Sequence, residues 1–265
     1  MPRPAPLQVV REHWPEYLME AAGLGLFMVS AAVVTTLLEY PHSPLHGLFT
    51  DQWTRRLLIG LAMGLTAIGL IYSPWGQRSG AHFNPAVTVT FFRLGKVSGV
   101  DATCYMLAQF IGGLIGLLAA ASAIGMAIEH PVVNYVATVP GAGGPSVAFV
   151  AELSISFGLM LVVLMLSNTK SLNGWTGLFA GALVATYIVI EAPLSGMSMN
   201  PARSFASALP AHLWTSFWIY FTAPPIGMLL AAEVYVRTKG VQRVLCAKLH
   251  HHNNTRCIFR CSYMA

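Results

Sequence analysis

Charged side chains are scarce in this sequence. Asp, Glu, Lys and Arg make up 9% of the 265 residues, whereas hydrophobic residues make up 55%. A soluble domain carries about one quarter charged residues, so this composition excludes an ordinary soluble fold. Six stretches contain no charged residue and are each close to the ~20 residues that a helix needs to cross a bilayer. These predicted membrane-spanning helices cover residues 21–38, 57–77, 102–128, 153–169, 171–190 and 213–232.

Lys and Arg are distributed unevenly between the two sides of the predicted membrane protein. If the N-terminus lies inside, the outer side holds only Arg55, Arg56 and Arg203, and the inner side holds the other twelve of the 15 basic residues. Cytoplasmic loops carry the excess of positive charge, so we expect a multi-pass protein of the cell membrane with both termini in the cytoplasm. The net charge of +5 then reflects topology and gives no reason to expect nucleic-acid binding.

Cysteine and the motifs of enzymes are also scarce or missing. Nothing resembles a nucleotide-binding loop or a catalytic triad, so we expect no catalytic residues and no energy coupling. No basic segment with a short apolar core and a cleavage site opens the chain, so the first span is expected to be retained. Of the four cysteines, Cys104 falls in a predicted span and three fall in the expected cytoplasmic tail. Reducing conditions there predict no disulfide.

One sequence pattern occurs twice. The frame S-G-x-x-x-N-P-A begins at Ser79 as SGAHFNPAVT and at Ser195 as SGMSMNPARS, which places Asn84 and Asn200 116 residues apart. Each half contains three spans, so the second half enters the membrane from the opposite side, and we expect an inverted repeat with its site near the midplane. The expected segments are a cytoplasmic N-terminal segment at 1–14, a first repeat at 15–128, a non-cytoplasmic loop at 129–147, a second repeat at 148–237 and a cytoplasmic tail at 238–265.

The repeated Asn-Pro-Ala tripeptides are start signals for helices. Asparagine is among the best N-cap residues, and proline suits the first helical position. The apolar stretches that follow are too short to cross a bilayer, since about ten residues span only ~15 Å. We therefore expect two re-entrant half-helices whose positive N-termini meet at the bilayer centre, oppose cations and offer asparagine amides to a neutral molecule. The tripeptide residues are Asn84, Pro85, Ala86, Asn200, Pro201 and Ala202.

The pair HFNPAVT and MNPARS, set among six predicted spans, resembles the major intrinsic protein family, the aquaporins and aquaglyceroporins, over residues 14–237. The resemblance implies an all-α, aquaporin-like membrane fold, a homotetramer with one pore in each subunit, and passive passage of water without protons or ions. Glycerol, urea and ammonia stay open as further solutes. Ser204, Ala208 and the pair Tyr220-Phe221 resemble the water-channel side of the family, whereas glycerol channels generally place an aspartate after the motif arginine.

A basic residue lies in the first turn of the second half-helix. Arg203 is unfavourable to the helix dipole and costly in a membrane unless it faces water, so a functional role is favoured. The family resemblance assigns it to a four-residue constriction whose other members align with Met63, Ile188 and Met197. Water-selective members resemble one another in having an aromatic residue and a histidine here, and this sequence has neither. In the alternative interpretation, Met63 and Ile188 are packing residues.

Two acidic residues occupy matching positions in the two halves. Glu20 and Glu152 could couple a secondary transporter to ions or protons, since such transporters also use inverted repeats and broken helices. They could instead accept the unsatisfied N–H groups of the re-entrant loops. The family resemblance favours this supporting role. His82, inside the first motif, is expected to hydrogen-bond its loop, with gating as the alternative.

The tail sequence CAKLHHHNNTRCIFRC, residues 246–261, is unlike the rest of the chain. It offers soft ligands at a spacing near that of structural zinc sites. The candidate ligands are Cys246, His250, Cys257 and Cys261, with His251 or His252 as substitutes for His250. The alternative is a basic tail that binds anionic lipid headgroups. We expect passage through the protein to need no cofactor, with zinc or another metal confined to the tail.

Overall fold

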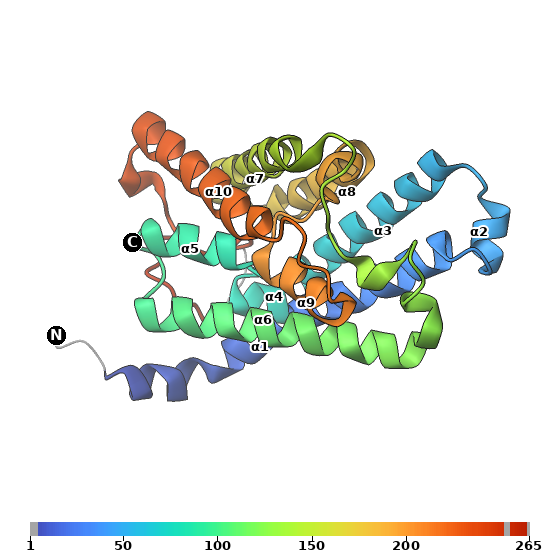
Figure 1. Ribbon diagram of the computed structural model, residues 1–265. Helices are drawn as coiled ribbons and strands as arrows, with labels where there is room; N and C mark the ends of the chain where they lie inside the picture. The colour runs from blue at the N-terminus through green and yellow to red at the C-terminus, as the bar shows by residue number, and fades with distance from the viewer. Residues whose placement is uncertain (1–4, 252–254, 264–265) are drawn as a thin grey trace.

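Six long helices form the body of the protein. The computed structural model describes residues 5–251 and 255–263, and within these residues all regular structure is helical. Six helices in this described part of the chain are long and apolar enough to cross a membrane. They are α1 (Pro6–Glu39), α3 (Gln52–Tyr72), α6 (Gly99–Ile124), α7 (Gly144–Ser167), α8 (Thr176–Ser195) and α10 (Trp218–Lys239). The predicted all-α architecture with six spans is confirmed (Figure 1).

Short helices connect and fill this bundle. The two half-helices are α5 (Pro85–Arg93) and α9 (Pro201–Ala211), with 9 and 11 residues. They enter the bundle from opposite ends and contact each other inside it (Figure 1). The remaining elements are α2 (Pro44–Leu48), α4 (Pro74–Ser79) and the 3₁₀ turns η1 (Gly125–Ile128), η2 (Asn134–Val136), η3 (Asn173–Trp175) and η4 (Val241–Arg243).

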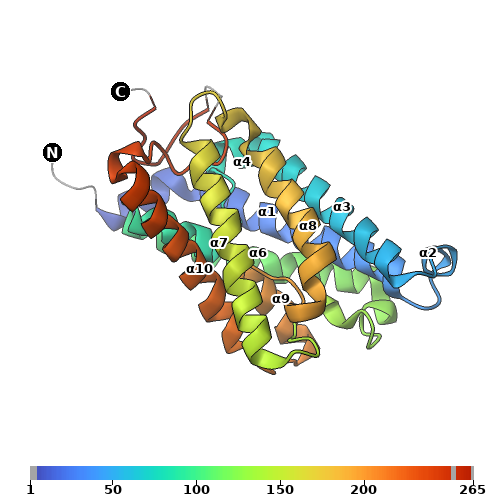
Figure 2. The ribbon, with the colours of Figure 1, turned by 90° about the horizontal axis from the view of Figure 1, so that it is seen from above.

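The packing of the helices follows an inverted repeat. In the first half α1 packs along α6, and in the second half the equivalent helices α7 and α10 pack along each other. The middle helices of the two halves, α3 and α8, pack together across the repeat, and Figure 2 shows them side by side. Each half-helix also contacts the last span of the other half, α9 with α6 and α5 with α10. These contacts between the two halves place the half-helices at the centre of the molecule.

Glycines allow the closest helix contacts. A Cβ atom on Gly112 of α6 would overlap the carbonyl oxygen of Ala21 in α1, and one on Gly227 of α10 would overlap the carbonyl oxygen of Leu153 in α7. The two contacts are equivalent under the repeat. Small residues at these crossings let two backbones approach closely. In a membrane, where lipid is as apolar as the side chains, such close packing drives the association of helices.

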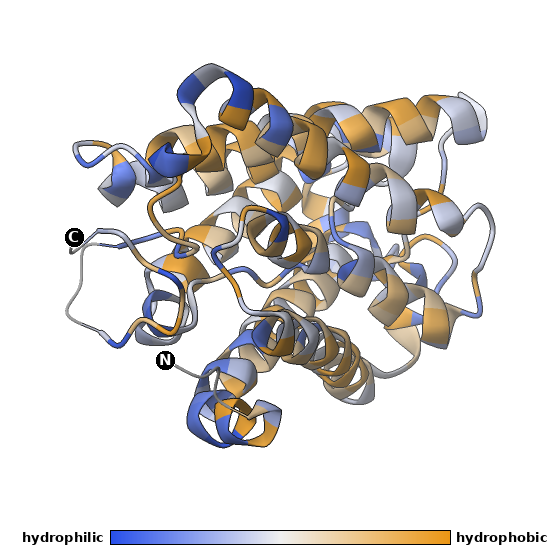
Figure 3. Cartoon of the chain, turned by 90° about the vertical axis from the view of Figure 1, so that its left-hand side faces the viewer, coloured by the Kyte–Doolittle hydropathy of each residue, from blue (hydrophilic) through white to orange (hydrophobic). Residues whose placement is uncertain are grey.

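The outer surface of the bundle is apolar. Leu65, Ile111, Ile115, Val150 and Ile190 each expose more than half of their side chains, with exposed fractions between 57 and 66%. Figure 3, which looks along the bundle, shows hydrophobic residues along the helices and hydrophilic residues mainly at helix ends and in loops. An apolar exterior over helices of membrane-spanning length indicates an integral multi-pass membrane protein.

The structure extends some helices beyond their charge-free stretches. α1 begins at Pro6, inside the expected N-terminal segment, and α7 begins at Gly144, inside the expected connecting loop. Three of the acids in these helices, Glu16, Glu20 and Glu152, are buried with partners, as where Glu16 accepts a hydrogen bond from Arg78 at 2.9 Å. A paired acid does not end a helix, so a window without charges underestimates the helix length. The start of α1 and the tail after α10 share one end of the bundle, here called the terminal face, and the opposite end is the distal face (Figure 1).

Candidate functional site

The two half-helices begin at the asparagines of the repeated motif. Asn84 Oδ1 accepts a hydrogen bond from the backbone N–H two residues further on, at 2.8 Å. Asn200 Oδ1 accepts the N–H groups two and three residues further on, at 3.0 and 3.2 Å. Pro85 and Pro201 occupy the first helical positions. Because proline has no N–H, the asparagine oxygen satisfies the next unpaired donors at each helix start.

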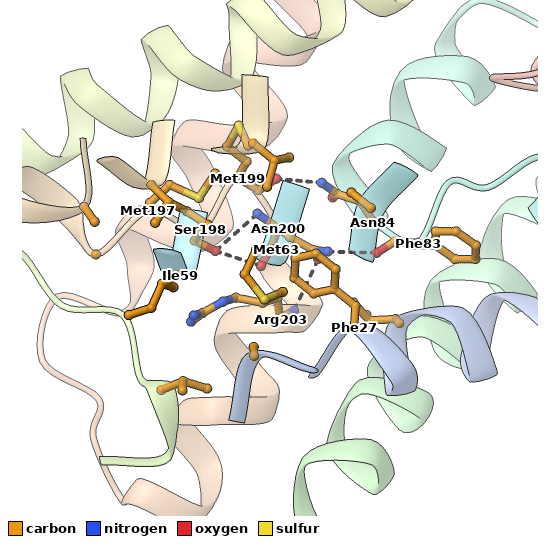
Figure 4. A pocket seen from close by; sticks show the side chains of 18 of the residues that line it. Phe27, Ile59, Met63, Phe83, Asn84, Met197, Ser198, Met199, Asn200 and Arg203 are labelled. Atoms are coloured by element: carbon orange, nitrogen blue, oxygen red, sulfur yellow. Dashed lines mark hydrogen bonds between the residues drawn. The ribbon is translucent and has the colours of Figure 1, made fainter. Parts of the chain in front are cut away.

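The asparagine amides also join the two half-helices. Asn84 Nδ2 donates to the carbonyl oxygen of Met199 at 2.7 Å, and Asn200 Nδ2 donates to that of Phe83 at 2.8 Å (Figure 4). Each bond runs from one motif to the loop of the other and holds the two helix starts together. An amide nitrogen carries two hydrogens, so one N–H of each asparagine remains for a further acceptor. The sequence did not indicate this cross-link, which uses half of the donors expected to face a neutral molecule.

The loops before the asparagines have a strained backbone at equivalent positions. The φ angle is positive at Ala81 and Phe83, 57° and 45°, and at Met197 and Met199, 52° and 54°. A left-handed conformation costs a non-glycine residue about 1–3 kcal/mol and persists only where the surroundings hold it. Both loops therefore need external support.

Glu20 contacts the first loop with both carboxylate oxygens. Its Oε1 accepts hydrogen bonds from Ser79 Oγ at 2.7 Å and from the N–H of His82 at 3.1 Å. Its Oε2 accepts from the N–H of Phe83 at 2.6 Å and from Gln109 Nε2 at 2.8 Å. The carboxylate is fully buried, and its charge is stabilised by these four donors.

Glu152 contacts the second loop in the same way. Its Oε1 accepts from Ser195 Oγ and from the N–H of Ser198, both at 2.7 Å, and its Oε2 accepts from the N–H of Met199 at 2.8 Å. The three donors are equivalent by the repeat to three of the four that bind Glu20. The inverted repeat therefore extends to the hydrogen bonds that fix the strained loops.

His82 connects the first motif to the tail. Its Nδ1 lies 3.1 Å from Thr88 Oγ1 in α5, and its Nε2 lies 2.8 Å from the carbonyl oxygen of Ala247. The ring stacks between Phe91 and Phe259, with ring centroids 5.2 and 5.4 Å away. The sequence predicted hydrogen bonds to the loop itself, whereas the structure places them on the half-helix and on the tail. Both ring nitrogens have partners.

A cavity of about 350 Å³ passes both asparagines. Its lining includes Glu39 and Arg56 near the distal face and Leu249 of the tail at the terminal face. All four residues predicted for the constriction line this cavity, which brings together side chains from α3, α8, the second loop and α9. They are Met63, Ile188, Met197 and Arg203.

Arg203 brings a charged donor to the cavity at the predicted constriction. Its Nη1 is buried, and no residue in the described ranges 5–251 and 255–263 accepts a hydrogen bond from it. Arg203 and Met63 line the same cavity (Figure 4), and the Met63 sulfur accepts a weak hydrogen bond from Ser30 Oγ at 3.8 Å. The side chains here are mostly apolar, and the polar groups are the guanidinium, Ser198 and the loop backbone. The arrangement can donate a hydrogen bond to a small polar molecule, and a cation would meet a fixed positive charge.

The sequence patterns did not indicate two residues that line the cavity or one acid that is buried near it. Phe27 and Ile59 line the cavity beside the constriction (Figure 4). Ile59 precedes Met63 by one helical turn and Phe27 follows Glu20 by two, so helical periodicity from a known site residue could have identified both. Glu191 in α8 is 97% buried, since only 3% of its surface is exposed. It lies next to a stretch chosen for having no charge, and composition gave no signal for its burial.

The tail brings four soft ligands together on the terminal face. The ligand atoms of Cys246, His251, Cys257 and Cys261 all lie within 4.8 Å of one another. Hydrogen bonding with the Cys246 thiol lowers the pKa of Cys257, and the His251 imidazole adds to this effect. Of the predicted histidine alternatives, His251 lies with the cysteines, whereas the ring of His250 packs edge-on against Tyr72. The other substitute, His252, lies outside the described residues.

The helices, the half-helices and the cavity define a membrane protein with an inverted repeat around a central polar site. Comparison with known proteins gives the family. The sequence model of the family described as Major intrinsic protein matches residues 9–235. The chain therefore belongs to this family.

Relatives and a solved structure agree with this assignment. A probable NIP-type aquaporin from Nicotiana alata is 35% identical over 189 residues, which cover 71% of this chain and 67% of that protein. Aquaporin NIP2-2 from Zea mays is 32% identical over 216 residues, covering 80% of this chain and 71% of that protein. The X-ray structure of the aquaglyceroporin from Plasmodium falciparum superposes with a TM-score of 0.70 at 18% identity, covering 84% of this chain and 95% of that one, which shows a shared fold.

Proposed function

We propose that the chain is a passive channel for water that also admits small uncharged solutes. The observation that carries this function is the meeting of two helix N-termini at Asn84 and Asn200 inside a cavity that reaches towards both faces. Each asparagine keeps one N–H for a permeating oxygen atom. A column of water could exchange its hydrogen bonds with these donors and with loop carbonyls as it passes.

Charge exclusion follows from the same geometry. The positive ends of the half-helix dipoles face each other at the asparagines, which disfavours any cation between them. Arg203 adds a fixed positive charge at the constriction. An anion would lose its hydration among apolar side chains with too few donors to replace it. Neutral molecules therefore meet the smallest barrier.

Osmotic shrinkage of proteoliposomes tests the proposed channel function. Proteoliposomes that contain the protein are expected to shrink faster in stopped-flow light scattering than protein-free vesicles, with no ion gradient present. A carrier would move its solute only with a proton or sodium gradient. Such a requirement would contradict a passive channel.

A secondary transporter is not favoured by the contacts of the two buried acids. Both oxygens of Glu20 and both oxygens of Glu152 accept hydrogen bonds from the loops and their neighbours. Binding a coupling ion would remove those bonds and release the strained backbone. We assign both acids to loop support, and we assign His82 to the contact between the first motif and the tail.

Ser204, Ala208 and the pair Tyr220-Phe221 support water as the main solute, whereas the constriction keeps glycerol, urea and ammonia open as further candidates. Three of its four side chains are flexible or branched apolar groups, and none is aromatic or histidine. Methionine adapts its shape, so the aperture is set by packing around it. The similar proteins described above include NIP-type aquaporins, which agrees with water as a permeating molecule.

Shortening Met63 is expected to widen the constriction. In Met63→Ala proteoliposomes, glycerol permeability should rise about threefold to tenfold because an apolar barrier is removed from the narrow point. Stopped-flow solute uptake measures the change. Met165→Ala is a matched control, since Met165 lies on α7 with 46% of its surface exposed. Equal glycerol uptake in both variants would contradict the assignment of Met63 to the constriction.

We further propose the orientation and assembly of the channel. The distribution of Lys and Arg supports a cytoplasmic terminal face in the cell membrane. Family membership supports a homotetramer with one pore in each subunit. No catalytic role and no cofactor are needed for conduction, because the proposed path uses only backbone groups, amides, one guanidinium and apolar walls.

A further inference from the structure

The ligand atoms of the tail have the spacing of a metal centre. The sulfur atoms of Cys246 and Cys257 lie 3.6 Å apart, and Cys261 Sγ lies 3.1 Å from His251 Nε2. A disulfide would require sulfur atoms about 2.05 Å apart. Thiolates held tetrahedrally at about 2.3 Å from one zinc ion lie roughly 3.7 Å from each other. The separation of the two thiols matches the second arrangement.

The residue types select the kind of metal. Three thiolates and one imidazole form a Cys₃His set, which is typical of closed, structural zinc sites. Soft sulfur ligands do not select Mg²⁺ or Ca²⁺, which prefer oxygen. Cys246 and His251 are five residues apart in the sequence and Cys257 and Cys261 are four apart, so all four ligands come from one short segment of the tail.

A buried lysine indicates negative charge at this place. Lys248 is 1% exposed, and its ammonium donates to Thr255 Oγ1 at 3.0 Å and to the carbonyl oxygen of Arg256 at 2.9 Å. Both acceptors are neutral, and an ammonium buried with neutral partners is costly unless a negative charge lies nearby. Three thiolates and a divalent ion carry one net negative charge. The buried carboxylate of Glu16 also acts on this ammonium, and a metal centre in the same loop would add the negative charge of its thiolates.

The loop that carries these ligands lies across the terminal mouth of the cavity. Leu249 lines the cavity, and its N–H donates to the carbonyl oxygen of Gly80 at 3.1 Å. The carbonyl oxygen of Ala247 lies 2.8 Å from His82 Nε2, and the Phe259 ring stacks on the His82 ring with centroids 5.4 Å apart. Residues between the first and last ligand therefore touch the first motif directly.

We propose that Cys246, His251, Cys257 and Cys261 bind one zinc ion that fixes the tail across the terminal mouth, where Leu249 narrows the path. The evidence for the metal site comes from its ligands and does not depend on the channel function. Its effect on flux rests on the proposed channel function, so the two parts are measured separately.

Metal content tests the site. The full-length protein, purified in detergent through a tag without histidine, is expected to hold about one zinc ion per chain by elemental mass spectrometry. Cys257→Ser with Cys261→Ser, and His251→Ala alone, should each lower zinc about tenfold or more. Cys104→Ser and His250→Ala are matched controls that should keep it, because neither side chain belongs to the cluster.

Three results would overturn the site. The first is a zinc content below about a tenth of an equivalent in the wild type after growth with added zinc. The second is equal zinc content in the ligand variants and the wild type. Intact mass under non-reducing conditions that shows a disulfide between Cys246 and Cys257 would also exclude it. For variants that fail to fold, chelation of the wild type and return of zinc give a second measurement, and failure to rebind zinc contradicts the proposal.

Flux tests the effect of the ion on the mouth. Removing zinc from wild-type proteoliposomes with a chelator is expected to raise water permeability about twofold or more, and adding zinc back should reverse the change. Leu249→Ala should raise permeability without lowering zinc content. Unchanged flux on zinc removal would overturn the role at the mouth. Absence of water flux in every sample, with zinc still bound, would instead contradict the proposed channel function.

Discussion

Replacing Glu152 with glutamine is expected to remove most of the water permeability while the helix content stays the same. The carboxylate accepts from Ser195 Oγ and from the N–H groups of Ser198 and Met199. Glutamine offers one acceptor oxygen, and its NH₂ group would face a donor. Each buried donor left without a partner costs about 1–3 kcal/mol. The second loop should then leave its strained conformation and carry Asn200 out of position.

The size of the effect follows from that cost. A penalty of ~1.4 kcal/mol shifts a conformational equilibrium about tenfold, so stopped-flow water permeability should fall about tenfold or more in Glu152→Gln. Glu20→Gln should behave alike, because it supports the first loop. Glu233→Gln is the matched control, since that acid lies on α10 with 43% of its side chain exposed. Wild-type flux in Glu152→Gln would contradict the supporting role.

Replacing Arg203 with alanine is expected to change what passes rather than how much water passes. The substitution removes a fixed positive charge and a large side chain from the constriction. Methylammonium and glycerol, which meet that charge and that aperture, should enter about tenfold faster. Uptake of each solute into proteoliposomes measures the change, with water flux followed in the same vesicles.

Arg56→Ala is the matched control for this experiment. Arg56 also lines the cavity, but it lies at the start of α3 near the distal face, away from the asparagines. Its loss should leave the exclusion of methylammonium intact. Equal solute selectivity in Arg203→Ala and the wild type would remove Arg203 from the filter.

The spans and the half-helices were predictable because their signals are local. Absence of charge over a bilayer thickness marks a span, and Asn-Pro marks a helix start at both Asn84 and Asn200. The inverted repeat followed from the number of spans between the two copies of one motif. The helices α1 and α7 were underestimated, because their acids are paired with partners distant in the sequence.

The hydrogen bonds of the site could not be predicted in the same way. Asn84 donates to a carbonyl 115 residues away along the chain, and His82 contacts one 165 residues away. Neither bond leaves a local pattern. The choice of His251 over His250 depends on which side of an extended segment faces the cysteines, and three consecutive histidines do not reveal it. Leu249 enters the cavity only because the tail folds back onto the first motif.

The most direct test of the central claim is a parallel measurement of water and proton flux in one preparation of wild-type proteoliposomes. Osmotic shrinkage and the decay of an imposed pH gradient would be followed in the same vesicles. Two half-helices that meet at Asn84 and Asn200 predict water flux well above that of protein-free vesicles, with proton flux equal to theirs. Proton leakage that rises with the amount of protein, or shrinkage no faster than in empty vesicles, would contradict the account.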